Sequence, residues 1–308
     1  MAEPGRHWRL LLGTAPDSWG VWLAHHPGQV EPARFLDEAQ AAGYTRIELG
    51  PYGYLPTDPE ALRDALERRG LTLTGGAIVA ELGRGAAAFD EAIAAADEAA
   101  PLLTQLGARF LVLLPGSDRD EAGNPIELSD NEWAGVCAAI DRLGRHVRDR
   151  WRLELVFHSH ADSLVQTEPE IVRLLEGTDP AAVGLCLDTG HVAYGGGDTV
   201  GLIERFPERI RYVHLKQVDP VVLRGVREEG LGFGEAVARG VMVEPNLGEP
   251  DMPAVLDALA ALGRELICIV EQDMFGCEPD RPFPIARRTR DYFAGLGLDV
   301  GEGMPARG

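Results

Sequence analysis

Closely spaced cysteines are missing from this sequence. Its four cysteines, Cys137, Cys186, Cys268 and Cys277, form no C-x-x-C pair, which argues against a disulfide framework and against a cysteine zinc site. Hydrophobic runs are also short, and none approaches the roughly 18 apolar residues that are needed to span a bilayer. The apolar stretch at residues 10–12 is too brief for the core of a signal peptide. We therefore expect a cytoplasmic protein that does not act at a membrane.

Basic residues are scarce relative to acidic ones. The chain has 29 lysines and arginines against 49 aspartates and glutamates, a formal net charge of −20. Such a charge repels a phosphate backbone, so the composition argues against nucleic acid as a partner. No G-x-G-x-x-G motif follows the first expected strand, which argues against a dinucleotide-binding Rossmann fold.

The sequence does contain a regular alternation of short apolar runs and longer segments with helical spacing. This alternation is typical of a parallel α/β fold, and eight strand-helix units favour a closed (β/α)8 TIM barrel over an open sheet. We expect residues 1–308 to form a single domain, since no Pro-rich or Ser-rich linker divides them. The expected strands are residues 10–15, 46–49, 72–79, 110–114, 153–158, 183–188, 210–215 and 266–271. The expected helices include residues 32–42, 59–69, 89–106, 132–150, 168–175 and 252–262.

Two segments stand outside this alternation. Residues 217–251 form a long connection after the seventh strand, in which residues 226–237 could be helical. A connection this long usually has a function, and we expect a lid over the site. Residues 294–308 are rich in glycine, and we expect a flexible tail there.

Residue types that bind metals end four consecutive expected strands. Strand five ends in His158-Ser-His160, strand six in Asp188-Thr-Gly-His191, strand seven in His214-Leu-Lys216 and strand eight in Glu271. Catalytic groups of a parallel barrel lie where the strands end, so these side chains should meet above the core. Imidazole and carboxylate ligands together favour borderline metals over Ca²⁺. We expect a divalent ion, Mn²⁺ or Co²⁺ first, with Fe²⁺, Zn²⁺ and Mg²⁺ as alternatives.

Each of these residues also has a purely structural interpretation. Asp188 could cap the helix after its strand, and His214 could be a hydrogen-bonded core histidine. Glu271 could pair with an arginine on a neighbouring helix. The joint pattern is harder to explain in this way, because adjacent barrel strands bring all of these side chains to one point.

Longer motifs resemble a known family. This chain resembles the xylose isomerase-like sugar isomerase/epimerase superfamily in residues 184–191 (GLCLDTGH), 211–216 (RYVHLK) and 269–273 (IVEQD). Its inosose dehydratase branch looks similar in residues 13–19 (GTAPDSW), 48–53 (ELGPYG), 158–160 (HSH), 165–167 (VQT) and 218–220 (VDP). The resemblance spans residues 13–292, and several motifs in the right order are more specific than any one of them.

The resemblance implies a metal held by a strand-five Glu, a strand-six Asp, a strand-seven His and a strand-eight Glu. In this sequence the last three correspond to Asp188, His214 and Glu271. Many relatives have Glu-x-His at strand five, whereas this chain has His158, which would replace a carboxylate by a neutral imidazole. If His158 does not bind the metal, Gln166 or water would complete the shell.

This departure at strand five bears on the reaction. In relatives that isomerise or epimerise sugars, the two glutamates resemble a pair that removes a proton and returns it on the other face. Since Glu271 alone of that pair is present, dehydration of a keto-inositol or related keto-sugar is favoured. Dehydration needs a base for the α-proton and an acid for the departing hydroxyl. His160, His191 and Lys216 are candidates, with loop packing, ligand orientation and surface charge as their respective structural alternatives.

Other polar groups are expected to shape the pocket for a small polyhydroxylated carbonyl substrate. Trp19 and Glu48 end the first two expected strands, and an aromatic face beside a carboxylate suits a cyclic polyol. Trp19 could equally belong to the core. Gln166 is a third candidate for substrate binding. The loops around the metal site lack an arginine cluster, which argues against a phosphorylated substrate.

Several alternatives stay open at this point. A sugar or inosose isomerase or epimerase would use the same metal-stabilised enediolate, and a 3-dehydroshikimate-type dehydratase is a narrower variant of the main hypothesis. A non-catalytic sugar-binding subunit would bind the substrate without turnover. An endonuclease on a related barrel needs a basic face, which a chain of charge −20 does not offer. Barrels of this family often form homo-oligomers, but the sequence shows no interface.

Overall fold

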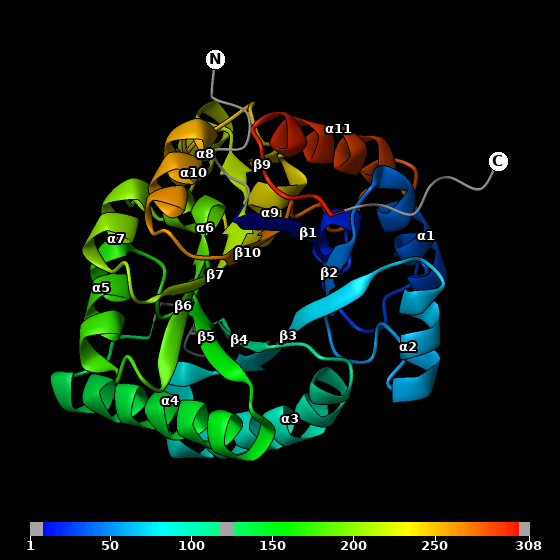
Figure 1. Cartoon of the computed structure of the whole chain (residues 1–308). Helices are drawn as coiled ribbons and strands as arrows, with labels where there is room; N and C mark the ends of the chain where they lie inside the picture. Colours follow the sequence, from blue (N-terminus) through cyan, green and yellow to red (C-terminus); the bar gives the residue numbers. More distant parts are fainter. Residues whose placement is uncertain (1–8, 118–125, 302–308) are drawn as a thin grey trace.

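A closed barrel of eight parallel strands forms the centre of the structure, a computed structural model that describes residues 9–117 and 126–301 (Figure 1). The barrel strands are β1 (Leu10–Thr14), β2 (Arg46–Glu48), β3 (Thr72–Ala80), β4 (Phe110–Pro115), β5 (Glu154–His158), β6 (Val183–Asp188), β7 (Ile210–Leu215) and β10 (Leu266–Val270). They follow one another around the ring in chain order, and β10 pairs with β1 to close it. The predicted (β/α)8 fold is therefore confirmed.

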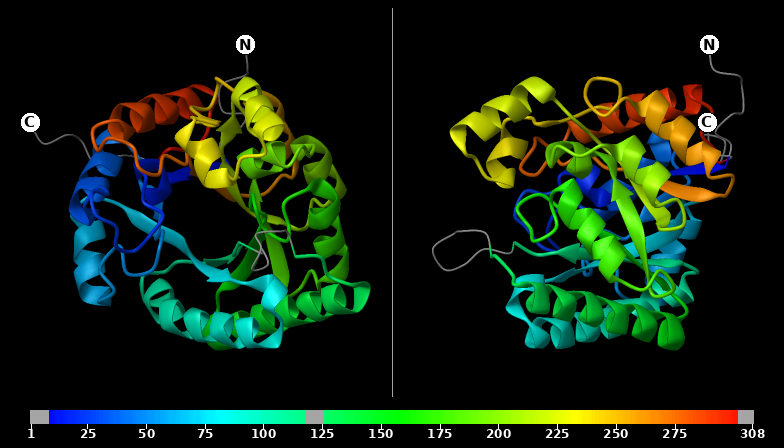
Figure 2. Two further views of the ribbon diagram at one scale, coloured as in Figure 1. Left: turned by 180° about the vertical axis from the view of Figure 1, so that it is seen from behind. Right: turned by 90° about the vertical axis from the view of Figure 1, so that its left-hand side faces the viewer.

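Helices surround the barrel on its outer side (Figures 1 and 2). They are α1 (Pro32–Ala42), α2 (Pro59–Glu67), α3 (Ala86–Gln105), α4 (Asp130–Trp151), α5 (Glu168–Gly177), α6 (Thr189–Tyr194), α7 (Thr199–Arg205), α10 (Met252–Ala261) and α11 (Pro282–Gly295). Local sequence explains their starts: Ser129 and Glu132 form a capping box before α4, and the Asp58 carboxylate accepts the Ala61 N–H at the start of α2. No helix in the described part of the chain is long and apolar enough to cross a membrane.

Apolar side chains fill the inside of the barrel below the strand ends. The members of this inner cluster are Ala15, Phe110, Val112, Val156, Cys186, Tyr212 and Ile269. Tyr212 reaches across the barrel, and its hydroxyl lies 2.7 Å from Thr74 Oγ1 on β3. Polar side chains above this cluster thus stand on a closed, apolar floor, which limits their access to water from below.

The chain makes its longest excursion from the barrel between β7 and β10. It contains β8 (Gln217–Val218), α8 (Pro220–Glu229), α9 (Phe233–Ala238) and β9 (Met242–Val243), and β8 pairs antiparallel with β9. Figure 2 shows α8 and α9 standing out at one end of the barrel. The helix expected at residues 226–237 is thus two helices, because the chain turns at Gly230 with a φ of +67°.

The end of the described chain packs against β1. Leu298 is buried, and the backbone of Asp299 exchanges hydrogen bonds with Leu10 and Leu12, of 2.9 and 2.7 Å. Residues 294–301 thus differ from the expected flexible tail, since α11 continues to Gly295 and an apolar side chain anchors the segment that follows. Residues 302–308 of that expected tail lie outside the described residues.

Candidate functional site

Four strand ends bring a cluster of potential metal ligands together. His158 ends β5, Asp188 ends β6, His214 lies on β7 and Glu271 directly follows β10. One ligand atom from each residue lies within 4.8 Å of those of the other three, and all four residues are at most 8% exposed. Two imidazoles and two carboxylates form a mixed nitrogen and oxygen set whose two negative charges match a divalent ion. The residues present therefore fit a divalent transition metal.

Asp188 uses its two carboxylate oxygens for different contacts. Oδ1 accepts the backbone N–H of His191 at 2.7 Å and so caps the start of α6. Oδ2 faces the cluster, 3.3 Å from His158 Nε2 and 3.8 Å from His214 Nδ1. Burial opposes ionisation, but the charge of Lys216 lowers the pKa of Asp188 well below its usual range. The helix-cap interpretation and a ligand role are therefore compatible.

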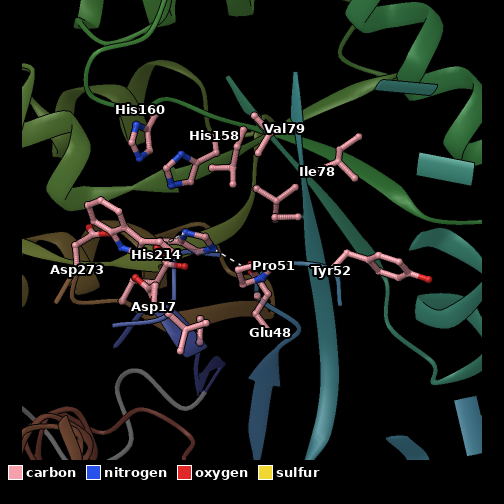
Figure 3. Close-up of a pocket in the computed structure, with 18 of the residues that line it drawn as sticks. Asp17, Glu48, Pro51, Tyr52, Ile78, Val79, His158, His160, His214 and Asp273 are labelled. Carbon is pink, nitrogen blue, oxygen red and sulfur yellow. Dashed lines mark hydrogen bonds and ion pairs between the residues drawn. The ribbon is translucent and has the colours of Figure 1, made fainter. Parts of the chain in front are cut away.

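Glu48 holds His214 from the side away from the cluster. His214 Nε2 lies 3.1 Å from Glu48 Oε2, a contact drawn as a dashed line in Figure 3. A proton on Nε2 leaves the lone pair on His214 Nδ1, which lies 3.0 Å from Glu271 Oε2 and has no hydrogen-bond partner among the described residues. A carboxylate behind a histidine is the usual support for a metal ligand. Glu48, expected to bind substrate, thus lines the pocket and also orients His214.

Lys216 places a buried ammonium group beside the cluster. Its Nζ lies 2.8 Å from Asp273 Oδ2, 3.1 Å from Glu271 Oε2 and 3.2 Å from Asp188 Oδ2. Burial opposes the charged form, but these three carboxylates raise the pKa of Lys216 well above its usual range. Lys216 therefore acts as a fixed positive charge. Burial opposes ionisation of Glu271, but His214 and Lys216 lower its pKa to about 2.

The backbone of one residue, Ala161, fixes the proton positions on His160 and His191. His160 Nδ1 donates to the Ala161 carbonyl at 2.7 Å, which leaves a lone pair on Nε2. His191 Nδ1 accepts the Ala161 N–H at 3.2 Å, so the His191 proton is on Nε2. The two rings lie with centroids 4.1 Å apart and both line the pocket. Burial and the neighbouring His158 lower the pKa of His160 to about 4, so the ring is neutral.

A cavity of about 590 Å³ opens over these side chains. Its polar side carries the residues described above, and β3 and β4 supply an apolar side that includes Val79 and Leu114. Phe233 of α9 lies over the histidine pair, with ring centroids 5.1 Å from both His160 and His191. Trp22 stacks on Phe233 at 5.8 Å, which joins the excursion after β7 to the loop after β1. The cavity thus has one polar wall, one apolar wall and an aromatic edge.

Two residues expected to bind substrate lie elsewhere. A 3₁₀ helix, η1 (Pro16–Trp19), follows β1 and turns Trp19 into the core, where it contacts Phe35 and its Nε1 donates to Glu38. Gln166 Oε1 accepts the Asp162 N–H at 2.6 Å and so holds the loop after β5. Neither Trp19 nor Gln166 is among the described residues that line the cavity.

Three pocket carboxylates were not singled out from the sequence, Glu98 of α3 and the pair Asp17 and Asp273. Asp17 and Asp273 lie in segments that carry the family resemblance, residues 13–19 and 269–273. Their signal was a polar residue a few positions beyond a strand end. The 3₁₀ turn after β1 decides which side chain of its segment faces the cavity, and strand periodicity does not reveal such a turn.

Comparisons with known proteins agree with this fold. The inosose dehydratase of Geobacillus thermodenitrificans (strain NG80-2) is 31% identical over 298 residues, covering 92% of this chain and 96% of that protein. Among solved structures, the IOLI protein with a binding zinc atom has a TM-score of 0.72 at 16% identity, covering 92% and 98% of the two chains. The D-allulose 3-epimerase from Methylomonas sp. in complex with D-allulose has a TM-score of 0.68 at 17% identity, covering 96% and 99%. Residues 36–292 match the family described as xylose isomerase-like TIM barrel, and the chain therefore belongs to that family, as its motifs predicted.

Proposed function

We propose that this chain is a metal-dependent hydro-lyase that removes water from a keto-inositol or a related keto-sugar. The observation that carries the proposal is the convergence of His158, Asp188, His214 and Glu271 at a cavity that also presents a neutral histidine pair. The full-length likeness to an inosose dehydratase supports the same reaction class. The substitution of His158 for the glutamate of isomerising relatives supports dehydration over isomerisation.

The four clustered residues would hold the ion, and Mn²⁺ or Co²⁺ suits this mixed set. A bound ion would polarise a ketone oxygen and so make the neighbouring C–H group more acidic. Glu48 keeps His214 in the orientation that presents Nδ1 to the cluster. Lys216 offsets part of the negative charge of the surrounding carboxylates.

The histidine pair supports the proton transfer that dehydration requires. His160 Nε2 offers a lone pair that can take the α-proton, while His191 Nε2–H can donate a hydrogen bond to a substrate oxygen. Phe233 covers both rings, and its backbone N–H donates to Asp162 Oδ2 at 2.7 Å. Asp162 lies in the loop after β5, the loop that also carries His160. The excursion at residues 217–251 is thus tied to the loop that carries the histidine, which supports a role as a lid that excludes water.

The charges that line the cavity support an uncharged polyol as the substrate. Among the described lining residues, five are acidic and Lys216 is the one lysine or arginine. The acidic residues are Asp17, Glu48, Glu98, Glu271 and Asp273. A phosphate or carboxylate group on the substrate would face these charges without an arginine to bind it. The apolar wall and Trp22 suit the C–H faces of a ring.

A panel of keto-inositols and keto-sugars, incubated with protein loaded with Mn²⁺ or Co²⁺, tests the proposal by mass spectrometry. A product about 18 Da lighter than the substrate, which corresponds to the loss of one water, supports the hydro-lyase. Unchanged mass with altered stereochemistry would instead assign an isomerase or epimerase on the same ligand set. Stoichiometric binding without any product would reduce the chain to a sugar-binding subunit.

A further inference from the structure

A second acid-base group faces the cavity from the β1 side. The role that we assign to this group rests on the reaction proposed above. We propose that the Asp17 carboxyl group binds the substrate hydroxyl that departs and donates the proton that turns it into water. Asp17 lines the cavity, and Figure 3 shows it and His160 on opposite sides of His214. A proton acceptor and a proton donor thus lie on different sides of the cluster, an arrangement that an anti elimination can use.

The neighbours of Asp17 hold its backbone rigidly. Ser18 Oγ donates to the Val270 carbonyl at 3.2 Å and accepts the Gln272 N–H at 3.0 Å, which ties η1 to the end of β10. Trp19 ties the other end of η1 to α1 through its 2.8 Å bond to Glu38. Asp17 therefore has a fixed position although its own side chain takes no part in these bonds.

The Asp17 carboxyl group lacks a partner of its own. Neither oxygen has a hydrogen-bond partner among the described residues, although both are shielded from solvent. Lys216 Nζ lies 4.0 Å from Oδ2, beyond hydrogen-bond distance. A buried carboxyl group without a partner costs free energy, and a preorganised one at a cavity wall is satisfied when a ligand hydroxyl arrives.

The surroundings of Asp17 favour its protonated form. Burial, followed by the negative charges of Glu271 and Asp273, raises the pKa of Asp17 well above its usual range, although Lys216 opposes the shift. Lys216 is already engaged, because its Nζ lies within 3.2 Å of the carboxylates of three other residues. The Asp17 O–H is thus a donor that no other described side chain claims.

The proposed elimination conserves atoms and electrons. The base takes the α-proton, and the C–H electron pair forms a C=C bond. The C–O bond at the β-carbon breaks, its electron pair leaves with oxygen, and that oxygen takes the Asp17 proton to become water. Asp17 is then a carboxylate, and the proton held by the base or by solvent restores it before the next turnover.

A fluorinated substrate separates proton donation from positioning. Fluoride is a weak base and departs without a proton, so a keto-inositol with fluorine in place of the departing hydroxyl does not need the acid. Asp17→Asn should lower water elimination on the order of 10²-fold or more, the scale of lost general acid help. Its fluoride release should stay within about threefold of wild type. Equal losses for both substrates, or no loss for either, would overturn the assignment of Asp17 as the acid.

Two controls keep this result interpretable. Asp64→Asn, an exposed carboxylate on α2, should change neither rate, and metal content should be equal in all three proteins. Calorimetry measures how tightly a non-reacting inositol binds to the metal-loaded proteins. The affinity should be about tenfold weaker in Asp17→Ala than in wild type, since one hydrogen bond to the carboxyl group is lost. Unchanged inositol affinity would overturn the hydroxyl contact. If wild type eliminates neither water nor fluoride, the proposed reaction fails, while the binding result still decides the contact.

Discussion

The two halves of the barrel mouth differ in how their side chains are held. On the half built from β5, β6, β7 and β10, nearly every polar group contacts two or more others, as Asp188 and Lys216 do. On the half built from β3 and β4, side chains such as Val79 and Leu114 face the cavity with no polar partner. The first half fixes the positions of its side chains through hydrogen bonds and ion pairs, and the second half fixes the shape of the cavity wall. We therefore expect the reaction to depend on one half and the fit of the substrate on the other.

We call the half built from β5, β6, β7 and β10 the polar half, and the largest effect of a substitution is expected at its centre. Asp188→Ala removes both a cluster carboxylate and the cap of α6, so metal binding and turnover should fall below detection. Mn²⁺ should raise the melting temperature of wild type but not of the variant, because a ligand stabilises only the protein that binds it. Glu204→Ala, an exposed carboxylate on α7, serves as the control. Full activity after exhaustive chelation of wild type would contradict the metal requirement altogether.

A change of ligand type at β5 should have the next largest effect. His158→Glu supplies the carboxylate of the isomerising relatives, so metal affinity should persist while water elimination falls on the order of 10²-fold. Metal analysis and product analysis by mass and stereochemistry would show the split. If His158→Ala leaves both metal affinity and rate untouched, His158 is not a ligand and the preference for dehydration loses its main support.

The aromatic edge joins the excursion after β7 to the loop after β1, and its loss should cost less. Trp22→Ala removes stacking on Phe233 and on Phe275, whose ring centroids lie 5.8 and 4.9 Å from Trp22. Aromatic pairs contribute about 0.5–1.5 kcal/mol, so kcat/KM should fall up to about tenfold. Hydrogen exchange at α9 should rise in the variant and should fall in wild type when ligand binds. Identical exchange with and without ligand would contradict a lid at residues 217–251.

Substitutions in the half built from β3 and β4, the apolar half, should change the kinetics least. Val79 is 58% exposed at the cavity mouth, so Val79→Ser removes little buried surface and leaves no polar group unpaired. KM should rise about threefold and kcat should stay unchanged, which steady-state kinetics would show. A large fall in kcat would mean that the apolar half also takes part in the reaction, and the contrast between the halves would be wrong.

Most of the fold could be predicted because its signal is periodic. The barrel strands begin within one residue of the expected positions, since each strand is a short apolar run between polar segments. The pattern failed where structure depends on contacts distant in sequence. The helix α11 was not anticipated, and Leu298 finds its buried place only once β1 and β10 are closed into a ring.

The site was predictable to the level of the strand and less so to the level of the side chain. The four clustered residues lie at strand ends, where position along the strand fixes the direction of the side chain. Trp19 and Asp17 lie beyond a strand end, in a 3₁₀ turn that rotates each residue by about 120° relative to the last. Extending the strand pattern into that turn would put Asp17 and Trp19 on the same face, whereas the actual turn presents Asp17 to the cavity and turns Trp19 into the core.

Ala161 shows how a reactive arrangement can be independent of side-chain identity. Its peptide N–H and C=O set the opposite tautomers of His191 and His160, while its methyl group takes no part in either bond. Any residue able to adopt the same backbone conformation would keep both contacts, apart from proline, which has no N–H. Replacing the single amide before Ala161 by an ester would remove one donor atom and free His191 to exchange its tautomer, with every side chain in the protein unchanged.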